Sequence, residues 1–560
     1  MKKLIIFLVA ITSLMWSCED FLDNKNYTKQ DDNSFPLTVE EANQLVVGVY
    51  NTLNEEISSY DNSSFFFNEL ASDERFGGGG TDNFNWQATS KLLNYGPDYF
   101  LGFWSNRYQG IFRANVALEK FENIPWENDK QKNTAYGEVH FFRGYYYFTL
   151  VQFFENVPLI LNSLSGNEPQ APVDDVYAQI AFDLKKAIEL FPNDPYSSYE
   201  KGRVTKWAAE AIMARVFLFY TGFYNKTELP LAGGGSITKS QVVAWLDDCI
   251  ANSGHDLVPD YRNLWPYTNE FTVEHYHYTQ GLGLRWAGES NQEVVFATKC
   301  ANGSGFRNGL CLAMTVRRPH GESKFPFPFT RGYGAGPISP VMVQQWEELE
   351  PNDMRRSASI WHADEYGDQY QWGGDNQAEE TGWWQKKYMG IASRTEDGTY
   401  QHSYNVPMYG LSVSSATSTG AFTQDLVHIR FADVLLMHSE LTETTTGINR
   451  VRSRANLDPI GAYTLQALKN ERRFELAFEN TRYNDIRRWG DAESLLEGQI
   501  GLPIKTTALD AVITHQIGFG ARYRATRGFF PIPQSQIRLS NNVLIQNPGW
   551  GTPEVEFTGL

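Results

Sequence analysis

Three glutamates stand at four-residue intervals late in the chain, at Glu471, Glu475 and Glu479. Residues spaced by four share one face of a helix, so these carboxylates would stand together. Two nearby carboxylates are the catalytic groups of most glycoside hydrolases, where the acid needs a raised pKa. Arginines interleave with the glutamates here, among them Arg472 and Arg487, and a neighbouring guanidinium lowers the pKa of a carboxyl group. The pattern therefore favours an ion-pair network over an acid–base pair.

Other signatures of catalysis are missing from the sequence. It contains no HExxH, no GxSxG and no GxxxxGK[ST] motif. The run Gly77–Gly80 is not followed by a Lys-Ser/Thr pair or by a helix start, so it predicts a flexible loop. His275 and His277 are an isolated pair, and the acidic stretch 363–380 lacks the spacing of a known calcium loop. We therefore expect no catalytic residue, no metal and no cofactor.

Charge and cysteine content narrow the class of protein further. The net charge is −18, which opposes binding to the phosphate backbone of nucleic acids. The chain has 4 cysteines and no CxxC pair, so neither a disulfide-rich scaffold nor a zinc site is indicated. Cys300 and Cys311 have two interpretations, a disulfide in an exported protein or two small packed side chains.

The N-terminus has the pattern of an export signal. A short basic segment precedes the apolar run Leu4–Trp16, which is shorter than the ~20 residues that a membrane-spanning helix needs. Cys18 follows a small residue, as in bacterial lipoprotein signals, although Met15 stands where such signals usually carry leucine. We predict a signal peptide over 1–17, lipidation of Cys18, and a polar, flexible tether over 18–34. The alternative is an ordinary secretory signal that is cut nearby.

Apolar residues at helical spacing dominate the first half of the chain. The run Tyr145–Phe148 covers every side of its helix, which predicts burial on all sides. The starts of successive helices recur at an interval close to the ~34-residue period of tetratricopeptide repeats. The predicted helices cover Val39–Glu56, Phe103–Phe121, Thr134–Phe154, Val173–Phe191, Val204–Tyr224 and Lys239–Ser253.

The composition of the sequence changes over about 256–423. This segment is rich in Gly, Asn, Pro and aromatic residues and lacks long helical patterns. A short strand is predicted at Glu293–Thr298. Helical patterns return at Gln424–Glu440 and Leu465–Trp489. We expect a helical scaffold into which a loop-rich segment is inserted.

Loops that carry aromatic and short polar side chains are the candidate binding positions. The C–H faces of sugars stack on rings, and sugar hydroxyls need hydrogen-bonding partners such as Asn, Asp or Arg. For each loop tryptophan the alternative is ordinary packing. The candidates are Asp73, Arg75, Asn83 and Trp86 in the window 72–86, Trp286 in a later loop, and Trp372 in the window 369–376.

Six segments resemble signatures of the SusD/RagB family, in the order in which that family carries them. One small departure is Asn456, which stands where a glycine often follows Arg-Ala. The segments are FFRGYYYFTLVQFFENVPL (141–159), GRVTKWAAEAIMARVFLF (202–219), IRFADVLLMHSEL (429–441), INRVRSRANL (448–457), ERRFELAFENTRYNDIRRWG (471–490) and FFPIPQSQIRLSNNVLIQNPGW (529–550).

The resemblance implies a mainly α, tetratricopeptide-like helical-repeat scaffold with an inserted, loop-rich and irregular capping subdomain. It places an N-terminal helical-repeat region over 35–255 and a C-terminal SusD/RagB region over 256–560, with the insert at about 256–423. It also implies a lipid-anchored protein on the extracellular face of the outer membrane. Such a protein captures an oligo- or polysaccharide and delivers it to a SusC-type TonB-dependent transporter.

Other functions remain open at this point. One is a peptide-binding member of the same family, and another is a scaffold or lid for the transporter that binds no ligand itself. A glycoside hydrolase would need a carboxylate pair that forms only in three dimensions. We predict a carbohydrate-binding protein that is not an enzyme.

Overall fold

The computed structural model describes residues 35–164, 166–300, 307–317, 328–369, 373–374, 376–394, 400–401 and 422–559. The predicted signal peptide, the lipidation of Cys18, the tether and the proposed ligand contact of Trp372 lie outside these residues. No helix in the described ranges has both the length and the apolar content needed to span a membrane.

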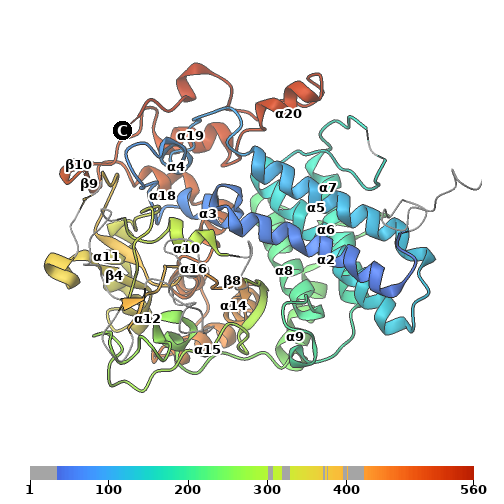
Figure 1. Cartoon of the computed structure of the whole chain (residues 1–560), viewed down its shortest axis with the longest axis horizontal. Helices are drawn as coiled ribbons and strands as arrows, with labels where there is room; N and C mark the ends of the chain where they lie inside the picture. The colour runs from blue at the N-terminus through green and yellow to red at the C-terminus, as the bar shows by residue number, and fades with distance from the viewer. Residues whose placement is uncertain are drawn as a thin grey trace, which may run out of the picture.

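Long helices packed side by side form one half of the molecule (Figure 1). All six helices predicted in this part are confirmed, with ends that differ by a few residues. The first begins at a capping box, in which Thr38 accepts from the backbone of Glu41 and the Glu41 side chain accepts from the backbone of Thr38. They are α2 (Val39–Ser58), α5 (Leu101–Lys120), α6 (Asp129–Phe154), α7 (Val173–Leu190), α8 (Lys206–Phe223) and α9 (Lys239–Asn252).

Helix α6 lies at the centre of this half, packed between α5 and α7. Tyr146 and Tyr147 are fully buried, as the predicted burial on all sides requires. Two glycines allow the close approach of the neighbouring helices. A Cβ at Gly110 of α5 would lie 2.5 Å from the Tyr146 ring, and a Cβ at Gly144 would lie 3.1 Å from Leu184 of α7. Larger residues at either position would push the helices apart.

The other half contains shorter helices and pairs of short strands. Among the described residues every sheet has two strands, and the predicted strand at 293–298 is confirmed as β3 (Val294–Thr298). It pairs with β8 (Leu426–Arg430), and further antiparallel pairs in this half join β4 (Ile360–His362) to β5 (Trp383–Gln385), β6 (Ser393–Arg394) to β7 (Tyr400–Gln401), and β9 (Pro503–Thr506) to β10 (Leu509–Val512). The pair of β1 (Leu229–Pro230) and β2 (Ser236–Ile237) belongs to the helical half, where β1 contacts α7 and α8. The helices here are α10 (Gly309–Ala313), α11 (Pro340–Leu349), α12 (Met354–Ser359), α14 (Phe431–Thr442), α15 (Thr446–Arg454), α16 (Leu465–Glu475), α17 (Arg482–Arg488), α18 (Ala492–Glu497), α19 (Phe519–Thr526) and α20 (Gln534–Leu539).

Two predicted helices are wrong in part. The segment 424–440 begins with strand β8, and α14 starts only at Phe431. A short apolar run fits a strand as well as a helix, and pairing with the distant β3 decides here. The segment 465–489 is two helices, because Phe478 and Asn480 between them have positive φ angles.

One hydrophobic core joins the two halves. The short helices α3 (Ser64–Leu70) and α4 (Phe84–Ser90) follow α2, and α3 contacts α17. Phe530, near the C-terminus, packs against Phe100 and Phe153 at ring distances of 4.7 and 5.0 Å. In Figure 1 the blue N-terminal helices α3 and α4 accordingly stand beside the red C-terminal helices.

The structure decides between the two interpretations of Cys300 and Cys311. Cys300 and Cys311 are both buried and free. The packed-side-chain interpretation holds for this pair.

Candidate functional site

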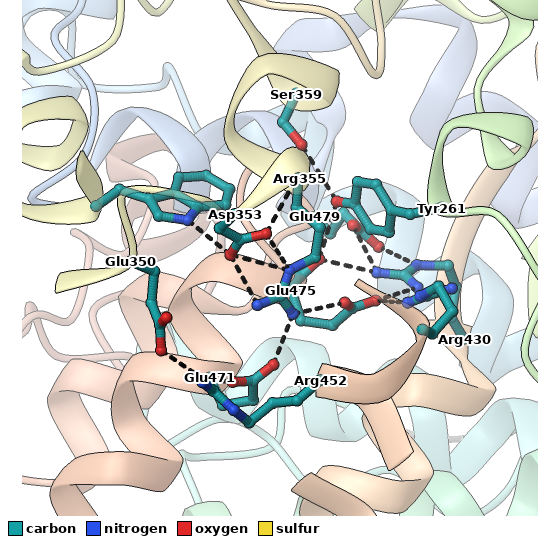
Figure 2. Close-up of polar contacts among 12 residues, drawn as sticks. Tyr261, Glu350, Asp353, Arg355, Ser359, Arg430, Arg452, Glu471, Glu475 and Glu479 are labelled. Carbon is teal, nitrogen blue, oxygen red and sulfur yellow. Dashed lines mark hydrogen bonds and ion pairs between the residues drawn. The ribbon is translucent and has the colours of Figure 1, made fainter. Parts of the chain in front are cut away.

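The three spaced glutamates lie in a buried network of charges (Figure 2). Glu475, at the end of α16, is 0% exposed. Its carboxylate contacts Arg355 of α12 at 3.0 Å, Arg430 at the end of β8 at 2.9 Å, and Arg454 of α15. Four separate elements therefore meet at one carboxylate.

The flanking glutamates are paired as well. Glu471 contacts Arg355 at 2.6 Å and Arg452 at 3.1 Å. Glu479 contacts Arg430 at 2.7 Å and Lys387 at 2.6 Å. The prediction of an ion-pair network is confirmed, but the predicted arginine partners are wrong. The cations come from other segments of the chain, and the interleaved Arg472 pairs instead with Asp433 and Asp485. Glu479 also lies beyond the end of α16 and not on the same helix.

Two opposing effects set the pKa values of these buried glutamates: burial raises them and the neighbouring cations lower them. Burial alone would raise the pKa of Glu475, but Arg454, Arg430 and Arg355 together hold it well below its usual value. For Glu471 the balance is opposite to our expectation, because burial outweighs Arg355 and raises the pKa of the carboxyl group. Burial also lowers the pKa of Lys387 to about 8 against the pull of Glu479. The network therefore joins α12, β8, α15 and α16 through buried charges.

The glycine run 77–80 differs from the predicted flexible loop. All four residues are buried, and the segment forms β-bridges from Gly78 to Ala335 and from Gly80 to Gln377. A Cβ at Gly77 would lie 2.5 Å from the backbone of Gln87. Glycine is needed here because the backbones approach too closely for any side chain.

Two of the candidate residues in this window point inward. The Arg75 side chain is 0% exposed, and it donates to Glu69 at 2.6 Å and to the carbonyl of Gly336 at 2.6 Å. Asp73 accepts two hydrogen bonds from Arg482, at 2.8 and 2.7 Å. Both therefore tie the window to the scaffold and present no polar group to a ligand.

The other two candidates in the window lie together. Trp86 is 4% exposed, and a Cβ at Gly79 would lie 2.6 Å from its ring. The Trp86 Nε1–H donates to Asp61 at 3.2 Å. The Asn83 side chain accepts from the backbone N–H of Gly80 at 2.7 Å and so shapes the loop beside the tryptophan.

Sequence reasoning missed two rings near this window, the partly buried Tyr60 and the exposed Tyr333. Tyr60 follows α2 in a short 3₁₀ turn, Tyr60–Asn62, and stands edge-on to Trp86 at 5.5 Å. Tyr333, which is 38% exposed, stands edge-on to Tyr60 at 6.0 Å. The predicted end of helix α2 is the sequence signal that could have drawn attention to Tyr60. No comparable signal marks Tyr333, because only the fold brings it next to Tyr60.

We call Tyr60, Trp86 and Tyr333 the aromatic rim. Asp61 positions it, because one carboxylate oxygen accepts from both Trp86 and the hydroxyl of Tyr99, the latter at 2.8 Å. Burial, with the nearby Asp61, raises the pKa of Tyr60 to about 12, so its hydroxyl stays neutral at physiological pH.

Polar groups border the rim at Gly80. A Cβ placed there would lie 2.7 Å from the Asp82 carboxylate and 3.0 Å from the Arg317 guanidinium. Asp82 is exposed, and Asn83 and Arg317 are partly exposed. The rim thus combines the exposed ring of Tyr333 and the partly buried ring of Tyr60 with short polar side chains and one guanidinium.

Trp286, the remaining described candidate, lies on a separate loop. It is partly buried against the core, and its backbone N–H donates to the carbonyl of Thr268 at 3.0 Å. The structure thus brings Asn83 and Trp86 together, keeps Asp73 and Arg75 inside, and places Trp286 elsewhere.

Fold and rim together define a helical-repeat scaffold that presents an aromatic and polar surface. Two family models match the chain. One is described as "Starch-binding associating with outer membrane" and matches residues 20–218, and the other, the SusD family model, matches 340–550. The chain belongs to the SusD/RagB family.

Curated relatives agree with this assignment. A SusD-like protein of Bacteroides ovatus is 24% identical over 69% of this chain, and the match covers 65% of that protein. SusD-like protein P25 of Formosa agariphila is 22% identical over 87% of this chain and 90% of its own length.

Solved structures show the same fold. A laminarin-binding SusD-like protein superposes with a TM-score of 0.67 at 24% identity, over 91% of this chain and 99% of its own. Surface glycan-binding protein A from Bacteroides thetaiotaomicron, in complex with laminarihexaose, gives a TM-score of 0.66 at 21% identity, over 92% and 100%. These neighbours share a tetratricopeptide-like helical fold with this chain.

Proposed function

We propose that this protein captures an oligo- or polysaccharide at the cell surface and delivers it to a SusC-type TonB-dependent transporter. The family assignment and the glycan ligands named for its structural neighbours support this role. We further propose that Cys18 carries the lipid anchor, on the extracellular face of the outer membrane. The protein in this proposal is a binder and not an enzyme.

The observation that carries the proposal is the aromatic rim. Tyr333 is exposed and Tyr60 is partly buried. The two rings stand edge-on to each other, so their accessible parts face different directions, which suits a curved chain of sugars better than a flat one. Stacking of each sugar on a ring removes apolar C–H surface from water. Asp82, Asn83 and Arg317 border the rings and can pair with hydroxyl groups, which gives selectivity because an unmatched buried hydroxyl costs ~1–3 kcal/mol.

Trp86 has a supporting role in this site. Its buried ring fixes the angle of Tyr60 from behind, and Asp61 fixes Trp86 in turn. We therefore assign direct contact with the glycan to Tyr60 and Tyr333, and we assign the position of the rings to Trp86 and Asp61.

Native gels that contain single polysaccharides test the proposal. The chain from Glu19 onward is run in gels cast with laminarin, starch, xylan, mannan or host glycans, beside Tyr60→Ala and Tyr333→Ala. Phe112→Ala is the matched control, since it removes an exposed ring from α5. We expect one or two polysaccharides to retard the parent chain and the control but not the rim variants.

Two other outcomes would change the assignment. Retardation that survives in both rim variants would keep glycan capture and move the site. Absence of retardation by every polysaccharide would favour the peptide-binding or ligand-free alternatives.

A further inference from the structure

The aromatic rim differs in charge from the protein as a whole. The chain has a net charge of −18, yet Arg317 borders the rim and Arg331 stands two residues before Tyr333. An acidic protein repels an acidic ligand at long range. Cations at its binding surface therefore act locally, either in ion pairs within the protein or on a ligand.

The backbone places Arg331 on the same face as Tyr333. Gly332 between them forms a β-bridge with the segment 312–317, and a Cβ at Gly332 would collide with a carbonyl oxygen of that segment. Side chains alternate along an extended chain, so Arg331 and Tyr333 leave together on the opposite face, ~6.6 Å apart at ~3.3 Å per residue. This is the face on which Tyr333 meets Tyr60 at 6.0 Å.

The Arg331 side chain is partly buried and has no partner within the part of the chain that the structure describes. None of its nitrogens is closed off from solvent. By contrast, the inward-pointing Arg75 is paired with Glu69 at 2.6 Å. A guanidinium stays charged and presents five donors in a planar fork. Water or an anionic ligand must therefore satisfy the donors of Arg331.

Arg317 lies on the other side of Tyr333 and is balanced by an acid. A Cβ at Gly334 would lie 2.7 Å from Cβ of Arg317, and a Cβ at Gly80 would lie 3.0 Å from its guanidinium. The latter position is also 2.7 Å from the Asp82 carboxylate, so Asp82 offsets the charge of Arg317. No described carboxylate offsets the charge of Arg331 in this way.

The other carboxylate of the rim, Asp61, is turned toward the protein. One of its oxygens accepts from the Trp86 indole at 3.2 Å and from the Tyr99 hydroxyl at 2.8 Å. Burial raises the pKa of this carboxyl group, although both hydrogen bonds lower it. Asp61 therefore positions the rings and does not serve as the counter-ion of Arg331.

We propose that the aromatic rim takes an acidic glycan, whose carboxylate or sulfate group pairs with the guanidinium of Arg331 while a sugar ring stacks on Tyr333. The inference rests on the proposed glycan capture and names the chemical class of its ligand. The planar fork of a guanidinium matches two oxygens of one carboxylate or sulfate group. A neutral glycan would leave the charge of Arg331 without a counter-ion in a partly buried place.

Calorimetric titration with polymers that differ only in charge tests this inference. The chain from Glu19 onward is titrated with polygalacturonate and with its carboxyl-reduced form, and with carrageenan and its desulfated form. Laminarin is the neutral reference. We expect an acidic polymer to bind at least tenfold more tightly than its own neutral form. Preference in the first pair assigns a carboxylate to Arg331, and preference in the second pair assigns a sulfate.

Matched variants tie this preference to one side chain. In Arg331→Gln the ratio of the acidic to the neutral affinity should fall about tenfold, which is the size of a charge-assisted hydrogen bond. Arg331→Lys should keep part of the ratio, because it keeps the charge without the fork. Arg285→Gln removes an exposed arginine beside Trp286 on the separate loop and should keep the whole ratio. Melting temperatures close to that of the parent would show that the variants remain folded.

The possible failures are distinguishable. Laminarin or another neutral polymer that binds at least as tightly as every acidic one would overturn the inference and leave glycan capture intact. The same holds for a ratio that is unchanged in Arg331→Gln. Absence of binding by every polymer, acidic and neutral, would overturn both this inference and the proposed function.

Discussion

Replacement of Arg430 by methionine tests the buried charge network most severely. The guanidinium contacts Glu475 at 2.9 Å, Glu479 at 2.7 Å and also Glu293. Methionine fills much of the same space and supplies none of the donors. The substitution therefore removes the charge and hydrogen bonds with limited loss of packing.

The expected loss of stability follows from the charges that remain in the network after Arg430 is replaced. The network holds five cations, Arg355, Lys387, Arg430, Arg452 and Arg454, and six carboxylates, Glu293, Glu350, Asp353, Glu471, Glu475 and Glu479. Loss of one cation deepens an existing excess of negative charge in a buried place. Removal of one partner from a buried pair costs about 3–5 kcal/mol, and Arg430 has three partners, so we expect a cost at the upper end of that range.

Urea denaturation followed by tryptophan fluorescence and far-ultraviolet circular dichroism measures this cost as the free energy of unfolding. Arg450→Met is the control, because Arg450 forms an exposed pair with Asp256 at 2.6 Å. A surface pair is worth less than about 1 kcal/mol. An equal, small loss in both variants would refute the view that these buried charges join α12, β8, α15 and α16.

Three further substitutions give distinct expected outcomes. Burial raises the pKa of Glu210 to about 9, so its contribution to stability is full below the unfolded pKa of about 4.3 and is lost as pH rises toward 9. Glu210→Gln should remove this loss of stability at high pH. The difference in melting temperature between the variant and the parent should therefore grow from pH 6 to pH 8.5. A difference that stays constant over this range would contradict the prediction. Gly79→Ala should cost more than Gly233→Ala in urea unfolding, because both have positive φ but only Gly79 faces a ring, at 2.6 Å. Trp86→Ala should cost about 3–5 kcal/mol as a core truncation, and a melting temperature like that of the parent would show that the ring does not support the rim.

Local patterns were sufficient to predict the long helices. Helices α2 and α7 begin at the predicted residues, Val39 and Val173, because the apolar stripe of each helix marks its start. The burial of Tyr146 and Tyr147 also follows from local sequence, since rings on every side of a helix leave no face for water. These features depend on neighbours close in the chain.

Features that depend on distant partners were predicted poorly. Strand β8 looks helical until β3, far away in sequence, supplies the pairing. The glycine run 77–80 looks flexible until residues 334–338 and 377 pack against it. The rim shows the same limit, because Tyr60 and Tyr333 meet only after the fold brings them together.

The direct test of the central claim is a calorimetric titration with the polysaccharide that retards the parent chain. We predict that the double variant Tyr60→Ala/Tyr333→Ala loses at least tenfold in affinity while its melting temperature stays close to that of Phe112→Ala, which should bind like the parent. Unchanged affinity in the double variant, or equal loss in Phe112→Ala, would contradict the assignment of glycan capture to the aromatic rim.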